Sequence, residues 1–596
     1  MSKAVIRVRK RVSSRSADRV HASIDPRPLV TGMNKILRDN SSVRPSFSSS
    51  WVASLGLDVS NLIAEYGVGE ERSAIYYLPE RAESLYYIMP VEYELPINHL
   101  KLIDSVLSEL MEHYPKNVSL ETMEQTRSYI KREAERLIPK FSSRLGIALG
   151  SDRKEELENV EKLSEIIAKY TSGLGVIEVL LKDDHIQDVY IDAPASSSFV
   201  HVTLSGIADP RIGNKLRTNI RLGEETAESL LSKFCLESGR PFSESNPVLE
   251  HNLSSFGARV TAVREPLSPK GVAIALRRHS TRPWTLLKFI ANRTLTAEAA
   301  GLISFLIDGR STILVAGSRG AGKSSFLGAM MLEFPQSQRI ITIEDTLELP
   351  ISAMQQLGYK VQSLYVQSCL GGKGEMTVDE ALKVSLRLGE SALILGEVRG
   401  QEARTLYEAM RAGTAGSSVM GTFHADSARA VFERVVHDMG INARSFSATD
   451  VVIVCGLTRP GGRQKEIRRV IQIAEVIKEG EGLFRELMTF DELEDRLVVG
   501  ENACGSSGRI SKIAKYWGMS LQDAAENIAV RSEIRQTIVD TALDKDKPNL
   551  LEAPWVIRSN NFFWQLMDSR RIGTRIDHER ILKDWKRWFV KSADYA

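Results

Sequence analysis

A strand-like apolar run that ends in a glycine-rich turn constrains this chain more than any other feature. The run covers Thr312 to Ala316, and the octapeptide from Gly317 to Ser324 follows it directly, ahead of a segment with helical periodicity. The octapeptide matches GxxxxGK(S/T) between a strand and a helix, the context in which that pattern binds phosphate. Its glycines let backbone N–H groups point at phosphates, while Lys323 adds positive charge and Ser324 can reach a magnesium ion.

The sequence therefore predicts a phosphate-binding loop in an α/β domain, with ATP and Mg²⁺ as cofactors. The expected ATP-binding residues are Gly317, Ser318, Arg319, Gly320, Ala321, Gly322, Lys323, Ser324 and Ser325.

Two acids and a histidine follow other strand-like runs in the same region. Glu397 is the best candidate for the carboxylate that manages magnesium and water, although Gly396 stands where a conventional Walker B motif has Asp. Glu344 follows a run that we expect to lie beside the P-loop strand, and a solvated, helix-capping role is an equal alternative for it. A lone histidine such as His424 is more often a packed residue than a phosphate sensor.

The order of these segments resembles the secretion ATPase superfamily of type II and type IV systems. After the octapeptide come Ile343 to Glu348, Ile394 to Arg399 and Thr422 to Ala425, which look like that family's Asp box, atypical Walker B motif and His box. The resemblance covers about 170–480, and more loosely 50–170. One departure is Gly416-Ser417, where the family often has a first histidine. This variant, and the lack of a tetracysteine insert, look closest to the archaeal branch.

The resemblance implies a ring, usually a hexamer, that hydrolyses ATP and assembles or extrudes pilin-like subunits through a polytopic membrane platform protein. It implies that Glu344 orients or deprotonates the attacking water, that Glu397 acts on magnesium-bound water and that His424 senses the γ-phosphate. Ser324 and Glu397 are the expected Mg²⁺ residues. Arginines from outside the P-loop domain would offset charge that builds up in phosphoryl transfer. The candidates are Arg259, Arg264 and Arg277.

Alternating strand-like and helical stretches predict an α/β fold with several domains. We expect a RecA-like P-loop NTPase domain with a parallel sheet, preceded by α/β N-terminal domains and followed by a helical C-terminal region. The expected divisions are a basic tail (1–50), an α/β and helical domain (51–170), a PAS-like α/β domain (171–288), the RecA-like ATPase domain (289–490) and a helical domain (491–596).

Charge and hydropathy limit where the chain acts and what it binds. Residues 1–50 hold eleven Lys/Arg against three Asp/Glu, whereas the remainder is net acidic, which argues against a nucleic-acid-binding body. No apolar run reaches the ~20 residues of a spanning helix, and the N-terminus lacks a secretory signal. We expect a cytoplasmic protein, peripherally associated with the inner face of the membrane, and no nucleic-acid partner.

Two other functions stay open on the sequence. A DNA-directed translocase or conjugation-type ATPase is suggested by the stretch from Ile510 to Ala525, which superficially resembles a helix-turn-helix but whose second helix is net acidic. A non-catalytic nucleotide-sensing scaffold is the other alternative. At the C-terminus, Ile581, Trp585 and Phe589 share one helical face. Packing of that face against the chain's own core is the default, and docking to a partner or a membrane surface is the alternative.

Overall fold

The computed structural model describes most of the chain in two compact units, residues 1–279 and 280–596. The described residues are 7–8, 42–43, 45–53, 57, 59–112, 122–207, 209, 211–213, 215–279, 282–366, 376–400, 402–411, 418–462, 466–478, 482–500, 503–569, 571–572 and 575–593. Most of the basic tail and the Gly416-Ser417 pair lie outside these ranges.

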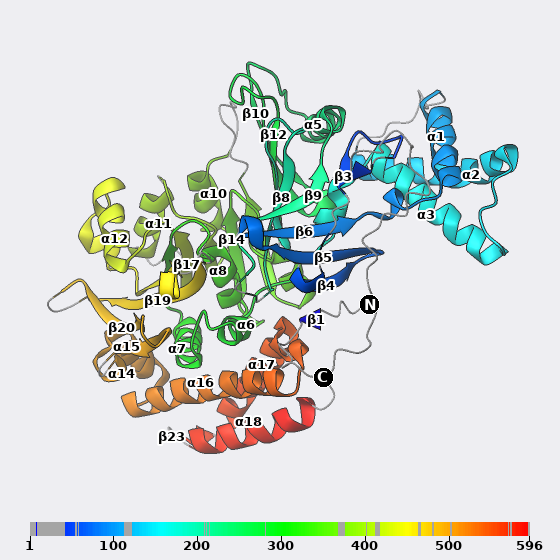
Figure 1. Cartoon of the computed structure of the whole chain (residues 1–596). Coiled ribbons are helices and arrows are strands. Elements are labelled where there is room, and N and C mark those ends of the chain that lie inside the picture. Colours follow the sequence, from blue (N-terminus) through cyan, green and yellow to red (C-terminus); the bar gives the residue numbers. More distant parts are fainter. Residues whose placement is uncertain are drawn as a thin grey trace. The chain divides into compact units, whose positions relative to one another are not determined.

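The first unit is built on one mixed sheet of twelve strands (Figure 1), and most of its neighbouring strands are antiparallel. The main path runs β1-β4-β5-β6-β9-β8-β7-β12-β11-β10, and β3 joins β9. The bounds are β1 (Arg7–Val8), β2 (Ser42–Val43), β3 (Trp51–Ala53), β4 (Leu62–Val68), β5 (Glu71–Leu78), β6 (Glu83–Met89), β7 (Ile186–Ile191), β8 (Phe199–Leu204), β9 (Leu216–Arg221), β10 (Val248–Leu253), β11 (Ala258–Val263) and β12 (Ala273–Arg278).

The helices of this unit form two groups. Helices α4 (Ile177–Leu181) and α5 (Glu224–Ser238) contribute apolar side chains to the core of the sheet, whereas α1 (Ile97–Glu112), α2 (Met123–Leu145) and α3 (Arg153–Thr171) share a separate core. Helices α2 and α3 are charged and amphipathic, and their polar faces are exposed.

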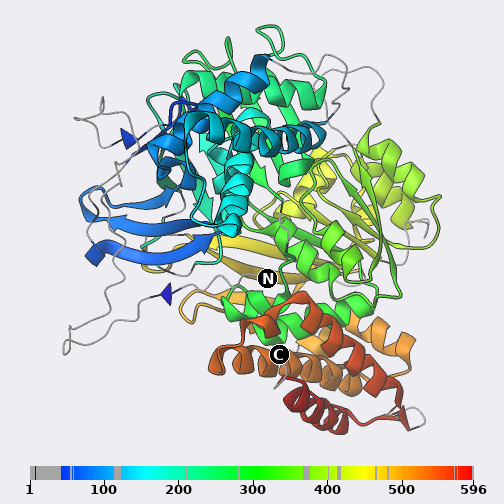
Figure 2. The ribbon, with the colours of Figure 1, turned by 90° about the vertical axis from the view of Figure 1, so that its right-hand side faces the viewer.

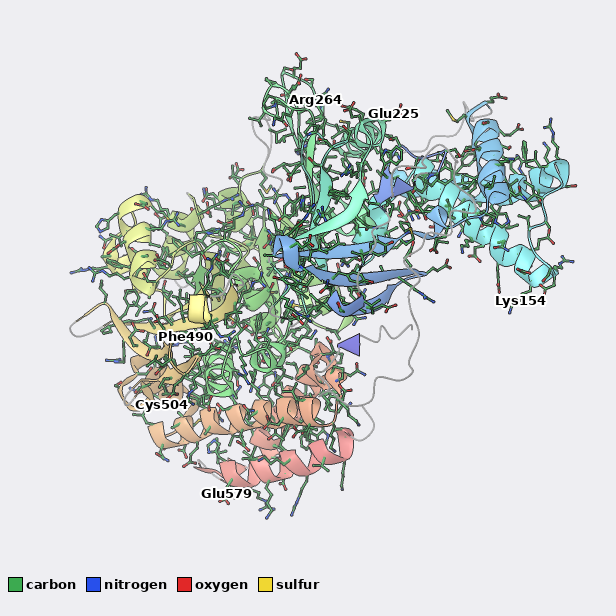
Figure 3. All side chains as sticks on the ribbon, in the orientation of Figure 1. Lys154, Glu225, Arg264, Phe490, Cys504 and Glu579 are labelled. Atoms are coloured by element: carbon green, nitrogen blue, oxygen red, sulfur yellow. The ribbon has the colours of Figure 1, made fainter. Side chains whose placement is uncertain are left out.

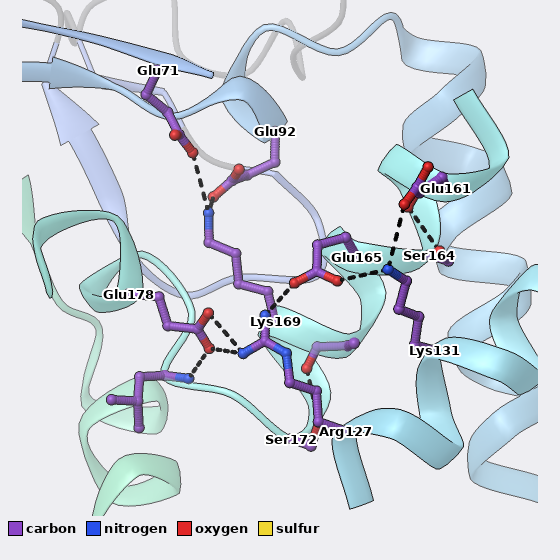
Figure 4. A network of polar contacts seen from close by, with 12 residues as sticks. Glu71, Glu92, Arg127, Lys131, Glu161, Ser164, Glu165, Lys169, Ser172 and Glu178 are labelled. Atoms are coloured by element: carbon purple, nitrogen blue, oxygen red, sulfur yellow. Dashed lines mark hydrogen bonds and ion pairs between the residues drawn. The ribbon is translucent and has the colours of Figure 1, made fainter. Parts of the chain in front are cut away.

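Paired charges, some fully buried, join α2 and α3 to the neighbouring segments (Figure 4). Lys169 Nζ on α3 lies 2.8 Å from Glu92 Oε1 and 3.8 Å from Glu71 Oε1, and all three side chains are less than a tenth exposed. Arg127 on α2 bonds both oxygens of the buried Glu178, at 3.0 and 2.9 Å. A buried charge is tolerable when it is paired in this way.

The second unit contains a nine-stranded sheet, ordered β15-β14-β16-β17-β13-β18-β19-β20-β21. The strands from β15 to β18 are parallel, and the rest continue the sheet in antiparallel fashion. The bounds are β13 (Ile313–Gly317), β14 (Arg339–Glu344), β15 (Lys360–Tyr365), β16 (Ala392–Leu395), β17 (Ser418–Phe423), β18 (Val451–Thr458), β19 (Ile467–Val476), β20 (Phe484–Asp491) and β21 (Arg496–Val499).

This sheet confirms the expected α/β class and RecA-like P-loop domain, with one correction. We expected β14 to lie beside the P-loop strand β13, but β16 and β17 stand between them. Sequence pattern identifies strands and not their order, because β14 and β16 are equally apolar and the pairing is decided by packing across the whole sheet.

Helices surround this sheet and continue into the C-terminal region. They are α6 (Leu286–Ala291), α7 (Ala297–Asp308), α8 (Lys323–Met331), α9 (Ile351–Gln356), α10 (Val378–Ser385), α11 (Glu402–Arg411), α12 (Ala428–Glu433), α13 (Ala443–Phe446), α14 (Ala503–Ser506), α15 (Gly508–Trp517), α16 (Leu521–Asp544), α17 (Ala553–Ser569) and α18 (His578–Ala593). A short hairpin of β22 (Arg571–Ile572) and β23 (Arg575–Ile576) precedes α18.

The C-terminal helices pack on the chain itself. Helix α16 lies along α7, and α18 contacts both α16 and α17, as Figures 1 and 2 show. Ile581 and Trp585 are fully buried and Phe589 nearly so, and the Trp585 and Phe589 rings stack with centroids 5.0 Å apart. The apolar face of α18 is thus occupied, so the default expectation holds and docking through that face does not.

The expected domain divisions remain proposals. Strands from 51–170 and from 171–288 share one sheet, and helices from 491–596 share an apolar core with the P-loop domain. Among the described residues, no helix combines the length and apolarity needed to cross a membrane.

Candidate active site

The glycine-rich loop connects β13 to α8 through backbone that tolerates no larger residue at two points. A Cβ on Gly317 would lie 2.4 Å from the carbonyl oxygen of Cys455 on the neighbouring strand β18. Gly322 has a φ of +90° and directly precedes Lys323, the first residue of α8. The loop therefore ends at a helix N-terminus, where unpaired N–H groups and the helix dipole favour phosphate.

The two polar residues that begin α8 are held by groups around the loop. Lys323 is 8% exposed, and its Nζ donates to the Ser318 carbonyl at 2.9 Å and lies 3.4 Å from Nδ1 of His424. The Ser324 hydroxyl donates to Oε2 of Glu348. A lysine and a serine hydroxyl at these positions are the groups that a nucleotide phosphate and its Mg²⁺ need.

Glu344 is the last residue of β14, and only one of its two carboxylate oxygens has hydrogen-bond partners among the described residues. Its Oε1 accepts the backbone N–H groups of Glu348 and Leu349 at 2.8 and 2.9 Å, whereas its buried Oε2 has no hydrogen-bond partner among the described residues. Burial raises the pKa of Glu344 to about 7, against the opposing effect of those two N–H donors. A carboxylate with a free oxygen and such a pKa is suited to proton transfer near neutral pH.

Gly396 explains how the side chain of Glu344 fits the site. A Cβ at position 396 would lie 3.1 Å from Cγ of Glu344, and Gly396 N donates to the Ile343 carbonyl at 2.8 Å. An aspartate at 396, as in a conventional Walker B motif, would compete for the space of Glu344. The departure noted in the sequence is therefore matched by the packing around Glu344.

Glu397 and His424 lie together just beyond the ends of β16 and β17. Oε1 of Glu397 is 3.4 Å from Nε2 of His424, and its Oε2 is 3.7 Å from Nη1 of Arg399, which also pairs with Asp345. Burial, and then the charge of Lys323, lower the pKa of His424, so its imidazole is neutral at pH 7. His424 thus bridges Lys323 and Glu397 through its two ring nitrogens.

The three predicted arginines all belong to the first unit and have partners there. Arg259 on β11 lies 3.2 Å from Glu250, and Arg277 on β12 lies 4.0 Å from Asp188. Arg264, labelled in Figure 3, follows β11 and stacks over the ring of Phe242 with its guanidinium 5.3 Å from the centroid. Their role at the nucleotide remains a proposal.

Sequence reasoning missed two residues that contact the loop. Arg468 on β19 donates from Nε to the Gly320 carbonyl at 2.8 Å, and Glu348 accepts the Ser324 hydroxyl. Glu348 was within the acidic segment but was not distinguished from Glu344. Arg468 carried no signal beyond strand alternation, in which Arg469 points inward and Arg468 outward, because β19 reaches the loop only through its pairing with β18.

The site as a whole fits a magnesium nucleotide. Backbone N–H groups at a helix N-terminus and Lys323 supply positive potential for phosphates, while Ser324 and Glu348 supply oxygen ligands of the kind that Mg²⁺ prefers. The unpaired oxygen of Glu344 gives a buried acceptor for a water proton. The arrangement can therefore bind a phosphate chain and polarise a water beside it.

Comparison with known proteins agrees with the geometry. Residues 212–506 match the family model described as type II/IV secretion system protein. An uncharacterised protein of Methanocaldococcus jannaschii, MJ0900, is 26% identical over 392 residues, which are 64% of this chain and 67% of that protein. Competence protein ComGA of Halalkalibacterium halodurans is 27% identical over 258 residues, 42% of this chain and 69% of ComGA. The archaeal relative fits the resemblance to the archaeal branch.

Among solved structures, the Legionella pneumophila ATPase DotB is similar over 51% of this chain and 79% of its own, with 16% identity and a TM-score of 0.37. The matched region 212–506 begins in the first unit and contains the whole P-loop site. With its ordered motifs, its RecA-like P-loop sheet and this family match, the chain belongs to the type II/IV secretion ATPase family.

Proposed function

We propose that this chain is a Mg²⁺-dependent ATPase motor that powers the assembly or extrusion of type IV pilus-like filaments, or type II-like secretion. The observation that carries the proposal is the meeting of Lys323, Glu344, Glu397 and His424 at the carboxyl ends of parallel strands, around a P-loop. Ligands bind at that edge of open α/β sheets. Family membership and the competence protein among its relatives support the choice of system.

The geometry suggests a role for each group. Ser324 and Glu348 lie together where they would hold Mg²⁺, directly or through water, and the ion would neutralise charge on the phosphates. Glu344, with its free Oε2 and raised pKa, is the proposed general base. Glu397 orients His424 and is the second candidate for the acid that acts on magnesium-bound water.

Movement would follow from a change of partners at Lys323. Its ammonium binds the Ser318 carbonyl and faces His424. A γ-phosphate would draw Lys323 and His424 toward itself, and hydrolysis would release them, so the two nucleotide states differ in contacts on β17 and α8. We propose that Arg259, Arg264 or Arg277 completes the site in a homohexamer, which docks on a polytopic platform protein at the inner face of the membrane.

Phosphate release from the purified full-length chain tests the catalytic part. We expect Lys323→Ala, Glu344→Gln and Glu397→Gln to lose at least about 100-fold in turnover, because each removes a group aimed at the reacting phosphate or water. Lys512→Ala, at an exposed position on α15, is the matched control and should turn over like the parent. Equal turnover in all of these variants would mean that the chain is a scaffold.

Stimulation of the same activity tests the mechanical part. Vesicles carrying the polytopic platform protein should raise turnover several-fold, and the same vesicles without it should not. If DNA stimulated the enzyme and the platform protein did not, the chain would be a DNA-directed translocase and the motor proposal would be wrong.

A further inference from the structure

The C-terminal helical region contains a cluster of metal-ligating side chains that the P-loop site does not use. Asp523 and Glu526 lie on the first two turns of α16, and His578 is the first residue of α18. One ligand atom from each of the three lies within 4.8 Å of the other two. The i, i+3 spacing puts both carboxylates on one face of α16, toward the start of α18.

His578 is the most buried member of this cluster. Its side chain is 3% exposed, and its Nδ1 has no hydrogen-bond partner among the described residues. That nitrogen lies 3.3 Å from Oε2 of Glu526, without the geometry of a hydrogen bond. On the other side of the ring, Nε2 is 3.5 Å from Nδ2 of Asn527, at the limit of a hydrogen bond, so little is lost when Nε2 takes the ring proton and leaves Nδ1 free to bind a metal. A buried ring nitrogen is therefore aimed at two carboxylates.

We propose that Asp523, Glu526 and His578 bind a divalent transition-metal cation, of which Zn²⁺ fits best. Zinc combines imidazole nitrogen with carboxylate oxygen at about 2.0–2.2 Å, which places neighbouring donors of a tetrahedral site about 3.4 Å apart. The pair of Nδ1 and Glu526 Oε2 already has this separation. Mg²⁺ and Ca²⁺ prefer sites made of oxygen alone. Glu526 is 47% exposed, so water can complete the coordination.

The bound ion would connect the first turns of α16 and α18, two helices in the same unit as the P-loop site. Helix α16 carries Arg531 and Arg535, which pair with Asp308 at the end of α7 and with Glu333 just beyond the P-loop helix α8. A metal that joins the start of α16 to α18 therefore stabilises the helix against which α7 and the end of α8 are held.

Zinc binding by the nucleotide-free full-length chain tests the site. After treatment with EDTA and dialysis, the protein is titrated calorimetrically with ZnCl₂ in the absence of Mg²⁺, and retained zinc is measured by mass spectrometry. We expect about one zinc ion that is lost, or bound at least about 10-fold more weakly, in His578→Ala and in Glu526→Gln. His437→Ala, which removes an exposed histidine in the same unit, should bind like the parent.

Thermal unfolding gives the second measurement. Zinc should raise the Tm of the parent and of His437→Ala by about 5 °C, because binding to the folded state stabilises it, and should leave the Tm of Glu526→Gln unchanged. Glu526→Gln keeps the shape of a half-exposed side chain, so it separates loss of a ligand from loss of the fold. A parent that retains no zinc, or variants that bind it equally well, would show that His578 and Glu526 form only a polar contact.

Discussion

The P-loop site and the charged network on α3 both bury ionisable groups, but they satisfy them differently. In the network Lys169 faces two carboxylates, and Glu92 accepts bonds from both Lys169 and the Tyr170 hydroxyl, each at 2.8 Å. At the P-loop, Glu344 keeps a buried oxygen without a hydrogen-bond partner, and its pKa is raised to about 7. Groups that support the fold are paired, whereas groups suited to chemistry are left with capacity for a ligand or a proton.

Breaking the paired network should give the largest effect on stability. Lys169→Met leaves Glu71 and Glu92 buried without their cation, which we expect to lower the free energy of unfolding by about 3–5 kcal/mol. Urea unfolding measures this change. Lys131→Met is the matched control, because Lys131 is nearly a third exposed and its partners Glu161 and Glu165 are more exposed still. A loss below about 1 kcal/mol in Lys169→Met would contradict the structural role.

Removing the P-loop cation should affect activity and leave the fold intact. Lys323→Ala should lower kcat by about 10²–10³-fold, the range seen when one donor to a developing negative charge is lost. Its stability should change little, because the Ser318 carbonyl and the His424 ring nitrogen that the ammonium contacts belong to uncharged groups, so no buried carboxylate there loses its cation. Phosphate release and urea unfolding of the same preparation separate the two effects. If Lys323→Ala unfolded readily but kept normal turnover, Lys323 would support the fold, as Lys169 does, and would not support the reaction.

Glu344 should give turnover at the P-loop site a pH dependence near neutrality. As a base it acts when ionised, so kcat should rise with pH and level off above about 7. Glu344→Gln should lower kcat about 100-fold and should abolish this rise of kcat with pH. Because the folded-state pKa is raised, the folded protein binds the proton more tightly than the unfolded chain. Glu344 therefore destabilises the fold increasingly as pH rises from about 4.5 to 7.

That sign gives a second measurement on the same variant. Above pH 7, Glu344→Gln should be more stable than the parent, since it removes the buried negative charge, and below pH 4.5 the two should be alike. Urea unfolding at pH 4.5 and pH 8 checks this. If kcat of Glu344→Gln still rose with pH as it does in the parent, the base would be another group, and Glu397→Gln would be the next variant to measure.

Local patterns in the sequence identified the parts of the site but not its assembly. The octapeptide and the strands β13 and β16 were predictable because the residues that form them are contiguous. The separation of β14 from β13 was not, because strand order depends on packing between distant segments. Arg468 was missed for the same reason, since it reaches Gly320 from β19, across β18.

The sequence also could not distinguish the roles of two neighbouring acids, Glu344 and Glu348. Glu344 and Glu348 lie in one segment and are chemically alike, yet one is buried with a free oxygen and the other bonds Ser324. Their difference comes from the turn after β14, which aims the N–H groups of Glu348 and Leu349 at Glu344. A sequence pattern records the acids and does not record which way such a turn faces.

The smallest change that should disturb the site is a single methyl group beside Glu344. The Cβ of Gly396→Ala would lie 3.1 Å from Cγ of Glu344, so the glutamate must shift by a few tenths of an ångström. Because a base acts only within hydrogen-bond reach of its water, we expect kcat to fall about 10-fold while the free energy of unfolding changes by less than about 1 kcal/mol.

Gly67→Ala is the matched control for that methyl group, because its nearest neighbour would be a carbonyl oxygen 3.9 Å from the new Cβ, and both activity and stability should stay at the parent's values. Turnover and urea unfolding of the two variants distinguish displacement of Glu344 from a general cost of replacing a strand glycine. Unchanged turnover in Gly396→Ala would mean that the exact place of Glu344 does not limit the reaction, and the general base would then have to be sought at Glu397.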